Sequence, residues 1–290
     1  MSRAMRFFKD IVFFCYLILR VVKDRSYINS LKYVKQDKPI SVFGNGPSLK
    51  NVIEKYLKDN SLRGKTDIMV LNFFAEQPCF KLFMPKHYCL ADPVFFRSQS
   101  EISERVNQFW DILRNETDWC MNLYVPRHFE KWARQQIDGH KFIKIISVNF
   151  TEYKGFESLR NFFYKKNYCT PIMQTVINMA IYVAINVGYR TIYLHGVEHS
   201  FFDGICVNSD NQLCVVNKHF YDKTKPVKNV IFNDKGQPMK VSEYLSAITK
   251  MFLSHDLLSE YAKKMGVSIY NCTQGSMIDS YSRINMNDVI

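Results

Sequence analysis

Two histidines in polar segments are the side chains of this sequence best suited to transfer protons. His199 stands in GVEHSFFDG, residues 196–204, and His219 stands in NKHFYDK, residues 217–223. An imidazole titrates near neutral pH, so it can accept a proton from an attacking hydroxyl or donate one to a leaving anion. Either ring could instead be structural and only hydrogen-bond a carbonyl group. The residues around His87, His128, His140 and His255 do not form a pattern that suggests a catalytic partner. We expect these four histidines to be structural or exposed.

A glycine-containing turn follows an apolar stretch near the N-terminus. The segment SVFGNGPSLKNVIEKYL, residues 41–57, predicts a strand, a turn and a helix for which Ser48 is the N-cap. Gly44 and Gly46 allow a close approach of the backbone, and the Asn45 amide can donate to an oxygen. Such a turn presents backbone N–H groups and a helix dipole, which suits a phosphate. The spacing matches neither GxGxxG nor a P-loop, and a tight turn without a ligand would use the same residues.

The sequence HGVEH, residues 195–199, also matches a zinc-binding motif of some peptidases. That pattern requires both histidines on one face of a helix, one turn apart. Here the segment follows RTIYL, which is typical of a strand, and it contains Gly196. We therefore expect a strand end and a loop at this place, and no metal site.

Strand and helix patterns alternate along the chain and predict an α/β fold. Apolar stretches typical of strands are at residues 39–44, 67–72, 87–91, 121–125, 142–148, 191–196 and 267–271. The clearest helical patterns are at residues 98–115, 171–187 and 241–264. This alternation predicts a mostly parallel sheet that helices cover on both faces. Residues 200–240 are rich in Asp, Asn, Lys and Gly, which predicts a long functional loop or lid.

The composition describes a globular protein with an anionic partner. Of 290 residues, 47% are hydrophobic and 15% aromatic, which is enough for one large α/β domain. We expect this domain at residues 37–290 and a separate segment at residues 1–36. A net charge of +12 favours an anionic ligand or membrane; no nucleic-acid-binding motif is present, so we expect no nucleic acid. The eight cysteines form no CxxC pair, which is typical of reduced thiols in the cytoplasm.

The N-terminal segment has the pattern of a basic, aromatic-rich amphipathic helix. The apolar stretch Ile11–Leu19 is too short to cross a bilayer, which needs about 20 residues. Cations flank it on both sides, namely Arg3, Arg6, Lys9, Arg20, Lys23 and Arg25. We expect a peripheral position on the inner face of a bacterial cytoplasmic membrane, an anionic membrane surface. The side chains expected to insert are Phe7, Phe8, Phe14 and Leu17. The alternative is a helix that packs on the domain or on a second subunit.

Four segments resemble a known group in their order and spacing. They are GNGPSL at residues 44–49, LNFF at 71–74, ADPVFF at 91–96 and INMAIYVAINVGYRTIYLHGVEHSF at 177–201. In these segments the chain resembles the bacterial sialyltransferases of glycosyltransferase family 42, and more loosely the MAF/DUF115-type proteins encoded with surface-polysaccharide genes. The resemblance covers residues 39–282. It implies a Rossmann-like glycosyltransferase domain of the variant GT-A type, with a lid over the donor, inverting chemistry and no metal.

The resemblance also implies where a CMP-activated sugar would bind. The donor-binding residues that it implies are Gly44, Asn45, Gly46, Asn72 and Asp92, and we expect Ser48 and Thr175 to bind the donor as well. The first three of these would meet the nucleotide phosphate. Asp92 stands where the family has Asn, so a carboxylate that only accepts hydrogen bonds replaces an amide that also donates. The sequence contains no Asp-x-Asp motif, which agrees with a donor that needs no metal.

For catalysis the resemblance implies a histidine base in the lid and two tyrosines on the leaving phosphate. His219 lies at about the place of the base, with Tyr221 as a leaving-group donor. Where the family has tyrosines this chain has His199 and Ser200, which we expect to bind the leaving phosphate instead. Sugar transfer through an oxocarbenium-like state needs both a base and hydrogen-bond donors on the departing phosphate.

The sequence therefore predicts a metal-independent, inverting glycosyltransferase without a cofactor. Its donor would be a CMP-activated nonulosonic acid, sialic acid-like or Kdo-like, and its acceptor a surface polysaccharide or a lipid-linked saccharide. Two alternatives stay open: a diphosphokinase that uses ATP and magnesium, and a non-catalytic nucleotide-sugar-binding partner in polysaccharide assembly. A second copy of the chain, in a homo-oligomer, is a further partner that the sequence allows.

Overall fold

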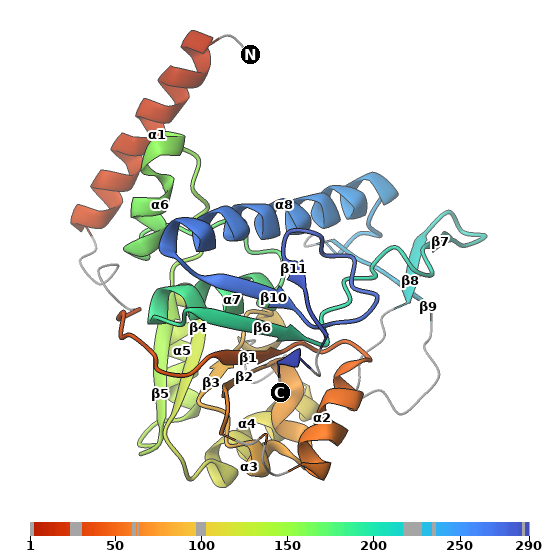
Figure 1. The fold of residues 1–290 in the computed structure, drawn as a ribbon. Coiled ribbons are helices and arrows are strands. Elements are labelled where there is room, and N and C mark those ends of the chain that lie inside the picture. Colours follow the sequence, from red (N-terminus) through yellow and green to blue (C-terminus); the bar gives the residue numbers. More distant parts are fainter. Residues whose placement is uncertain are drawn as a thin grey trace.

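An eight-stranded sheet forms the centre of the structure, a computed structural model that describes residues 3–23, 31–59, 62, 64–96, 103–216, 228–233, 236–285 and 288–289. The strand order is β11-β10-β6-β1-β2-β3-β4-β5, and all neighbouring strands run parallel (Figure 1). The strands are β1 (Ile40–Phe43), β2 (Asp67–Leu71), β3 (His87–Cys89), β4 (Met121–Pro126), β5 (Ile143–Val148), β6 (Thr191–His195), β10 (Ser268–Asn271) and β11 (Ser282–Arg283). The predicted α/β class is confirmed, and every predicted strand segment contributes a strand.

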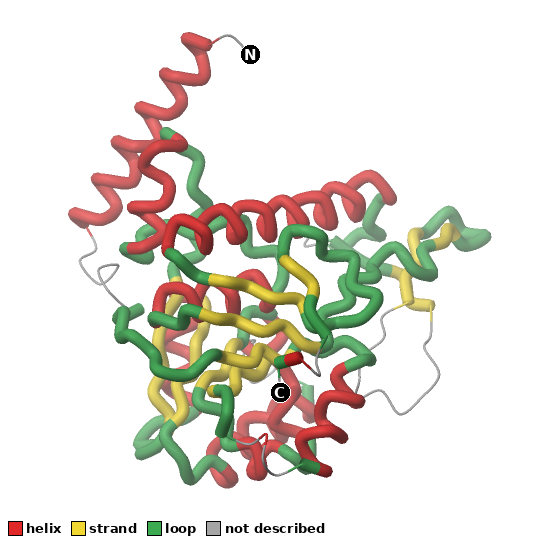
Figure 2. The backbone as a smooth tube through the Cα atoms, in the orientation of Figure 1, coloured by secondary structure: helices red, strands yellow, loops and turns green. Residues whose placement is uncertain are grey.

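Helices cover both faces of this sheet (Figure 2). The core on one face includes α1 (Arg3–Lys23), α6 (Glu157–Lys165), α7 (Val176–Val187) and α8 (Val241–Met265). The core on the other face includes α2 (Leu49–Lys58), α3 (Phe80–Phe83), α4 (Glu104–Glu116) and α5 (Glu130–Gln136). Successive side chains of a strand point to opposite faces, so Val42 enters the first core and Phe43 the second. Short 3₁₀ turns follow three strands, namely η3 (Asn72–Glu76), η4 (Pro93–Phe96) and η5 (Arg127–Phe129).

The central helix α7 is apolar on all sides because it lies between the sheet and α8. Every one of its residues from Ile177 to Val187 is buried. The helix was expected from residue 171 but begins at Val176, since Thr175 has extended backbone and caps the first turn. It ends at Gly188, whose left-handed φ of 108° closes the helix. The N-terminal end of this buried helix is therefore fixed in place by its own cap.

Residues 200–240 were expected to form a long loop or lid, and the described part of this segment has regular structure. Three short antiparallel strands form a small sheet, β7 (Cys206–Val207), β8 (Leu213–Val216) and β9 (Lys228–Val230). Leu213 and Val215 pack against Tyr244 and Ile248 of α8, which attaches the small sheet to the body. The expected loop is thus corrected to a small sheet wherever the structure describes this segment, and the role of a lid stays a prediction.

The path of the chain creates a crevice beside β1. The chain runs outward from β1 through β2, β3 and β4 to β5, and it then returns to place β6 on the other side of β1. The connections that leave β1 and β6 therefore go in opposite directions. In open parallel sheets, ligands bind outside the carboxyl ends of the strands at such a reversal.

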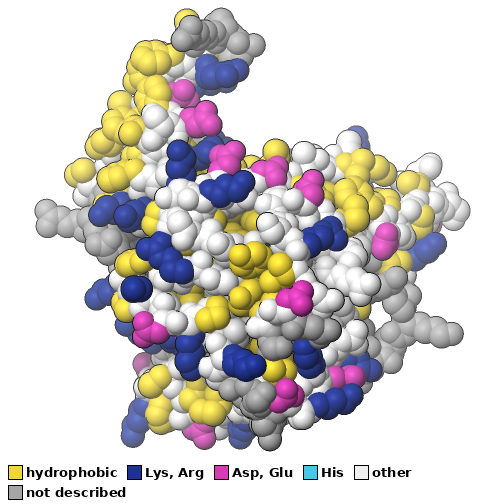
Figure 3. Space-filling view, in the orientation of Figure 1, with side chains coloured by type: hydrophobic (Ala, Val, Ile, Leu, Met, Phe, Trp, Pro, Cys, Tyr) yellow, Lys and Arg dark blue, Asp and Glu magenta, His cyan; other side chains and the backbone are white. Residues whose placement is uncertain are grey.

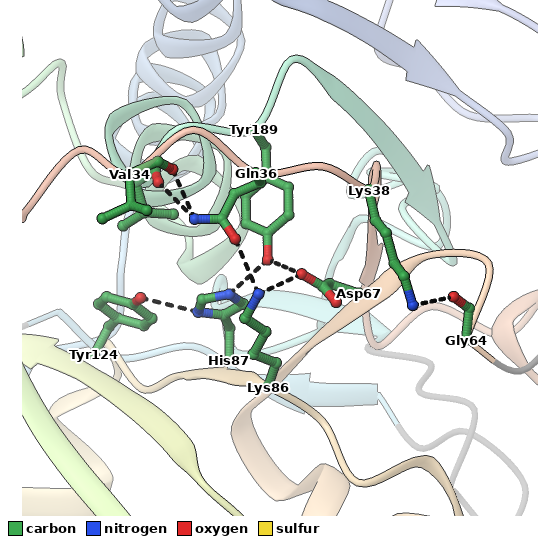
Figure 4. A network of polar contacts seen from close by, with 10 residues as sticks. Val34, Gln36, Lys38, Gly64, Asp67, Lys86, His87, Tyr124 and Tyr189 are labelled. Carbon is green, nitrogen blue, oxygen red and sulfur yellow. Dashed lines mark hydrogen bonds and ion pairs between the residues drawn. The ribbon is translucent and has the colours of Figure 1, made fainter.

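A polar network around the buried His87 closes the opposite, amino-terminal edge of the sheet (Figure 4). Asp67 Oδ2 accepts hydrogen bonds from Lys86 Nζ at 2.6 Å and from the Tyr189 hydroxyl at 2.5 Å. Because the Tyr189 hydroxyl donates to Asp67, it accepts from His87 Nε2, 2.8 Å away. His87 Nδ1 then accepts from the Tyr124 hydroxyl at 2.9 Å. A neutral His87 with its proton on Nε2 satisfies both of these hydrogen bonds.

Acidification should destabilise the protein through His87. Burial, helped by the charge of Lys86, lowers the pKa of His87 to about 3, whereas an unfolded histidine titrates near 6.5. Between these values only the unfolded chain takes up the proton, so stability falls as the pH decreases from 6.5 toward 3. At pH 5 this one residue should cost about 2 kcal/mol relative to pH 8.

Urea unfolding at pH 8 and pH 5 measures this effect in the wild type and in His87→Gln. The variant should lose less stability on acidification than the wild type does, even if it is less stable at pH 8. Equal pH dependence in the two proteins would show that His87 is not held neutral by the fold.

Candidate functional site

A cavity of about 640 Å³ lies at the carboxyl edge of the sheet, where the topology creates the crevice. Its walls come from the segments that follow β1, β2, β3, β4 and β6 and from the N-terminal end of α7. Polar residues that line it include Asn45, Asn72, Asp92, Thr175, Glu198 and His199. Asp92, Glu198 and Asp203 bring carboxylates to the wall, and no Lys or Arg is among the described residues that line it.

The turn after β1 lies directly against the turn after β6. The Gly44 N–H donates to the His195 carbonyl at 2.7 Å, and the Gly46 N–H donates to the Gly196 carbonyl at 2.8 Å. A Cβ at Gly44 would lie 2.3 Å from the Gly196 oxygen, and one at Gly46 would lie 1.4 Å from Glu198 Oε2. Glycine is therefore required at both positions, because the two turns and the Glu198 carboxylate leave no room for a Cβ.

The carboxylate of Glu198 lies at the N-terminal end of α2. Its Oε1 accepts the Ser48 N–H at 2.7 Å. The next N–H groups, those of Leu49, Lys50 and Asn51, donate to backbone carbonyls of residues 46–48. The expected N-cap bond of Ser48 is absent, since its backbone is helical (φ −69°, ψ −15°) and its side chain accepts no cap hydrogen bond. A carboxylate from the β6 loop thus satisfies the helix end where a phosphate was expected.

Three side chains of the cavity wall carry buried oxygens without a hydrogen-bond partner among the described residues. These atoms are Asn45 Oδ1, Asn72 Oδ1 and Glu198 Oε2. All of them are acceptors, and an unsatisfied buried acceptor costs free energy until a donor reaches it. Asn72 also has a left-handed φ of 49°, a strained conformation of the kind that concentrates at functional sites. The wall is therefore suited to a ligand that presents hydroxyl or amine donors.

His199 belongs to a second polar network, which lies behind the cavity wall. Its backbone is left-handed, with φ 51°, and its Nε2 lies 3.0 Å from Nε2 of His255 in α8. Asn178 Nδ2, from the first turn of α7, approaches the same His255 nitrogen at 3.2 Å. On the other side of that ring, His255 Nδ1 lies 3.0 Å from the Tyr281 hydroxyl.

The capping box of α7 determines where the protons of this network lie. Asn178 Oδ1 accepts from the Thr175 N–H and hydroxyl, so the amide nitrogen of Asn178 must face His255. His255 Nε2 is therefore an acceptor, and His199 Nε2 must donate to it. His199 then keeps its lone pair on Nδ1. Burial lowers the pKa of His199 to about 3 and that of His255 well below its usual range, so both rings are neutral at pH 7.

Most of the expected site residues lie around this cavity. Asn45, Gly46, Asn72, Asp92, Thr175, His199 and Ser200 line it, and Gly44 and Ser48 flank it in the turn after β1. Asp92 Oδ1 accepts the Val94 N–H at 2.9 Å and so shapes its own turn. His219 and Tyr221, expected as base and leaving-group donor, lie outside the described residues, and their roles stay predictions.

Sequence reasoning missed the residues that hold the site together. His255 was expected to be structural or exposed without a partner, yet it contacts His199 across 56 positions of sequence. The contact of Glu198 with the end of α2 likewise spans 150 positions. The one signal in the sequence for these contacts was the adjacent pair Glu198 and His199, on the loop after β6.

The segment HGVEH does not form a helical zinc motif. It begins on the last residue of β6 and continues as a loop, as expected. The His195 ring is buried and packs edge-on against Phe43, with ring centres 5.7 Å apart, whereas His199 turns toward α8. Within the described part of the chain, no three His, Cys, Asp or Glu side chains are grouped to hold a metal ion.

Comparisons with known proteins give a distant structural likeness. No protein-family model matches the chain, and no curated protein matches it. The chain is similar to the MAf glycosyltransferase from Magnetospirillum magneticum AMB-1, with 15% identity and a TM-score of 0.49. The match covers 88% of this chain and 35% of that protein, so the chain spans about a third of its length. Similarity at this level carries no functional argument, and the resemblance to family 42 stays a prediction from the sequence.

Alanine substitutions at Gly44 and Gly46 should distinguish a steric clash with the backbone from a steric clash with a side chain. Gly44→Ala meets a carbonyl group of the sheet edge, so it should destabilise the fold by about 3 kcal/mol. Gly46→Ala meets mainly the end of the Glu198 side chain, and its cost should be smaller, about 1–2 kcal/mol. Urea unfolding of each variant, with and without Glu198→Ala, gives the interaction free energy between the two substitutions. Glu198→Ala should reduce the loss of stability caused by Gly46→Ala and leave the loss caused by Gly44→Ala unchanged. An equal reduction at both positions would contradict the described crossing.

Proposed function

We propose that this chain is a glycosyltransferase that takes its sugar from a nucleotide-activated donor. The observation that carries the proposal is the cavity at the topological reversal, whose wall presents the unsatisfied acceptors of Asn45, Asn72 and Glu198. Ribose and sugar hydroxyls and a base amine are the donors that such a wall requires. The segments that resemble family 42 build this same wall, which supports a CMP-activated nonulosonic acid as the donor.

The phosphate of the donor belongs at the N-terminal end of α7 in this proposal. The first N–H groups of α2 already donate within the chain, and the charge of Glu198 lies beside them, so that helix end repels an anion. Thr175 and Val176 bring the start of α7 to the cavity, with the positive end of the helix dipole. The residues around Thr175 would thus meet the leaving phosphate.

His199 is the proton acceptor of the proposed reaction. The acceptor hydroxyl attacks the anomeric carbon, the bond from that carbon to the phosphate oxygen breaks, and CMP leaves with the electron pair. The attacking oxygen becomes strongly acidic as its new bond forms, so even a weakly basic imidazole suffices to take the proton on Nδ1. This role differs from the phosphate contact expected from the sequence, because Nδ1 of the tautomer set by His255 accepts and does not donate.

Release of CMP from CMP-N-acetylneuraminic acid tests the proposal, measured with EDTA present and with a saccharide acceptor. The wild type should release CMP, and His199→Gln should lower the rate by about 10²–10⁴, the usual contribution of a positioned base. Binding of CMP, measured by calorimetry, should stay within about threefold in this variant because the ring contacts the acceptor and not the nucleotide.

Three results would contradict the proposal. The first is a wild-type protein that neither binds CMP nor consumes CMP-, UDP- or GDP-activated sugars. The second is transfer of a diphosphate from ATP that requires magnesium, which would assign the chain to the diphosphokinase class. The third, near-normal turnover in His199→Gln, would move the base to another residue.

A further inference from the structure

The outward half of α1 is an apolar surface that the rest of the described chain does not cover. Its most exposed side chains are Phe8 at 67%, Leu19 at 70% and Val22 at 71%. Further exposed apolar residues on the helix are Met5, Phe7, Ile11, Val12, Tyr16 and Ile18. At 100° per residue these positions span roughly half of the helix circumference. Figure 3 shows apolar side chains along the outer edge of this helix.

The inward half of α1 is fixed to the body. Leu17 is buried, and the ring of Phe14 packs edge-on against Phe163 of α6. Arg20 donates to the Thr151 hydroxyl at 2.9 Å. These contacts determine which side of the helix faces outward. They also correct the sequence-based expectation that Phe14 and Leu17 insert into a membrane, since both side chains pack inward.

The charged residues of α1 are mainly basic. The helix contains Arg3, Arg6, Lys9, Arg20 and Lys23 against one acidic residue, Asp10. Arg6 and Lys9 are exposed. An apolar face with exposed cations beside it matches a bilayer surface that carries anionic headgroups, where the apolar side chains insert and the cations stay at the phosphate level.

From this we infer that α1 docks the protein on an anionic lipid surface, with Phe8, Val12, Leu19 and Val22 in the acyl boundary. The helix lies in the membrane plane, since no helix of the described residues is long and apolar enough to cross a membrane. A second copy of the chain fits the surface less well. One partner helix covers a narrow stripe, whereas this apolar surface is about half a cylinder.

Vesicle flotation tests the inference with the full chain and two compositions, equimolar phosphatidylglycerol and phosphatidylcholine, and phosphatidylcholine alone. The wild type should float with the anionic vesicles at about 0.1 M salt, where the screening length is about 10 Å, and less at about 1 M. Phe8→Asp with Leu19→Asp should lower the bound fraction at least tenfold. Arg6→Gln with Lys9→Gln should remove most of the salt dependence.

Leu57→Asp, at an apolar position of α2 that is 45% exposed, is the control away from α1 and should float like the wild type. Unchanged melting temperatures would show that the variants are folded. Wild-type protein that does not float with anionic vesicles overturns the inference, and so does equal flotation of Phe8→Asp with Leu19→Asp. A wild-type dimer that this double variant converts to a monomer, without flotation of either, would assign the surface to a second copy. The test is independent of the proposed reaction, because it requires no turnover.

Discussion

The crossing of the turns after β1 and β6 is the contact on which the site depends. Two backbone hydrogen bonds, from Gly44 to His195 and from Gly46 to Gly196, hold these turns together at the topological reversal. Side chains beyond hydrogen would separate them, as the short distances from a Cβ at either glycine show. Because the turns are in contact, Glu198 reaches the end of α2 and His199 faces α8. The sheet order therefore determines the chemistry of the cavity wall.

Glu198 gives this crevice a different character from a phosphate-binding turn. A helix N-terminus attracts any anion, and here the chain supplies its own carboxylate. The same carboxylate leaves Oε2 without a partner beside Asn45 Oδ1 and Asn72 Oδ1. The wall thus combines satisfied donors with unsatisfied acceptors. A ligand with several hydroxyl groups satisfies such a wall better than a bare phosphate does.

The parallel sheet and its helices could be predicted from the sequence because their signals are local. Buried strands such as DIMVL and the apolar helix Val176–Val187 carry their patterns within one segment. The contacts of His199 with His255 and of Glu198 with Ser48 join segments that are distant in the sequence, so no local pattern predicts them. The small sheet at residues 206–230 was missed because its strands are two to four residues long. For α1 the sequence indicated the helix, but Leu17 and Phe14 show that packing on α6 decides which side faces outward.

A crystal structure of the chain with CMP tests the central claim most directly, namely that the crevice between the turns after β1 and β6 is a nucleotide-sugar site. Nucleotide hydroxyl or amine groups should lie within hydrogen-bond distance of Asn45 Oδ1 and Glu198 Oε2, and the phosphate should lie near Thr175 at the start of α7. The bond from the Ser48 N–H to Glu198 should persist. A nucleotide bound elsewhere, or a phosphate that displaces Glu198 from the end of α2, would contradict it.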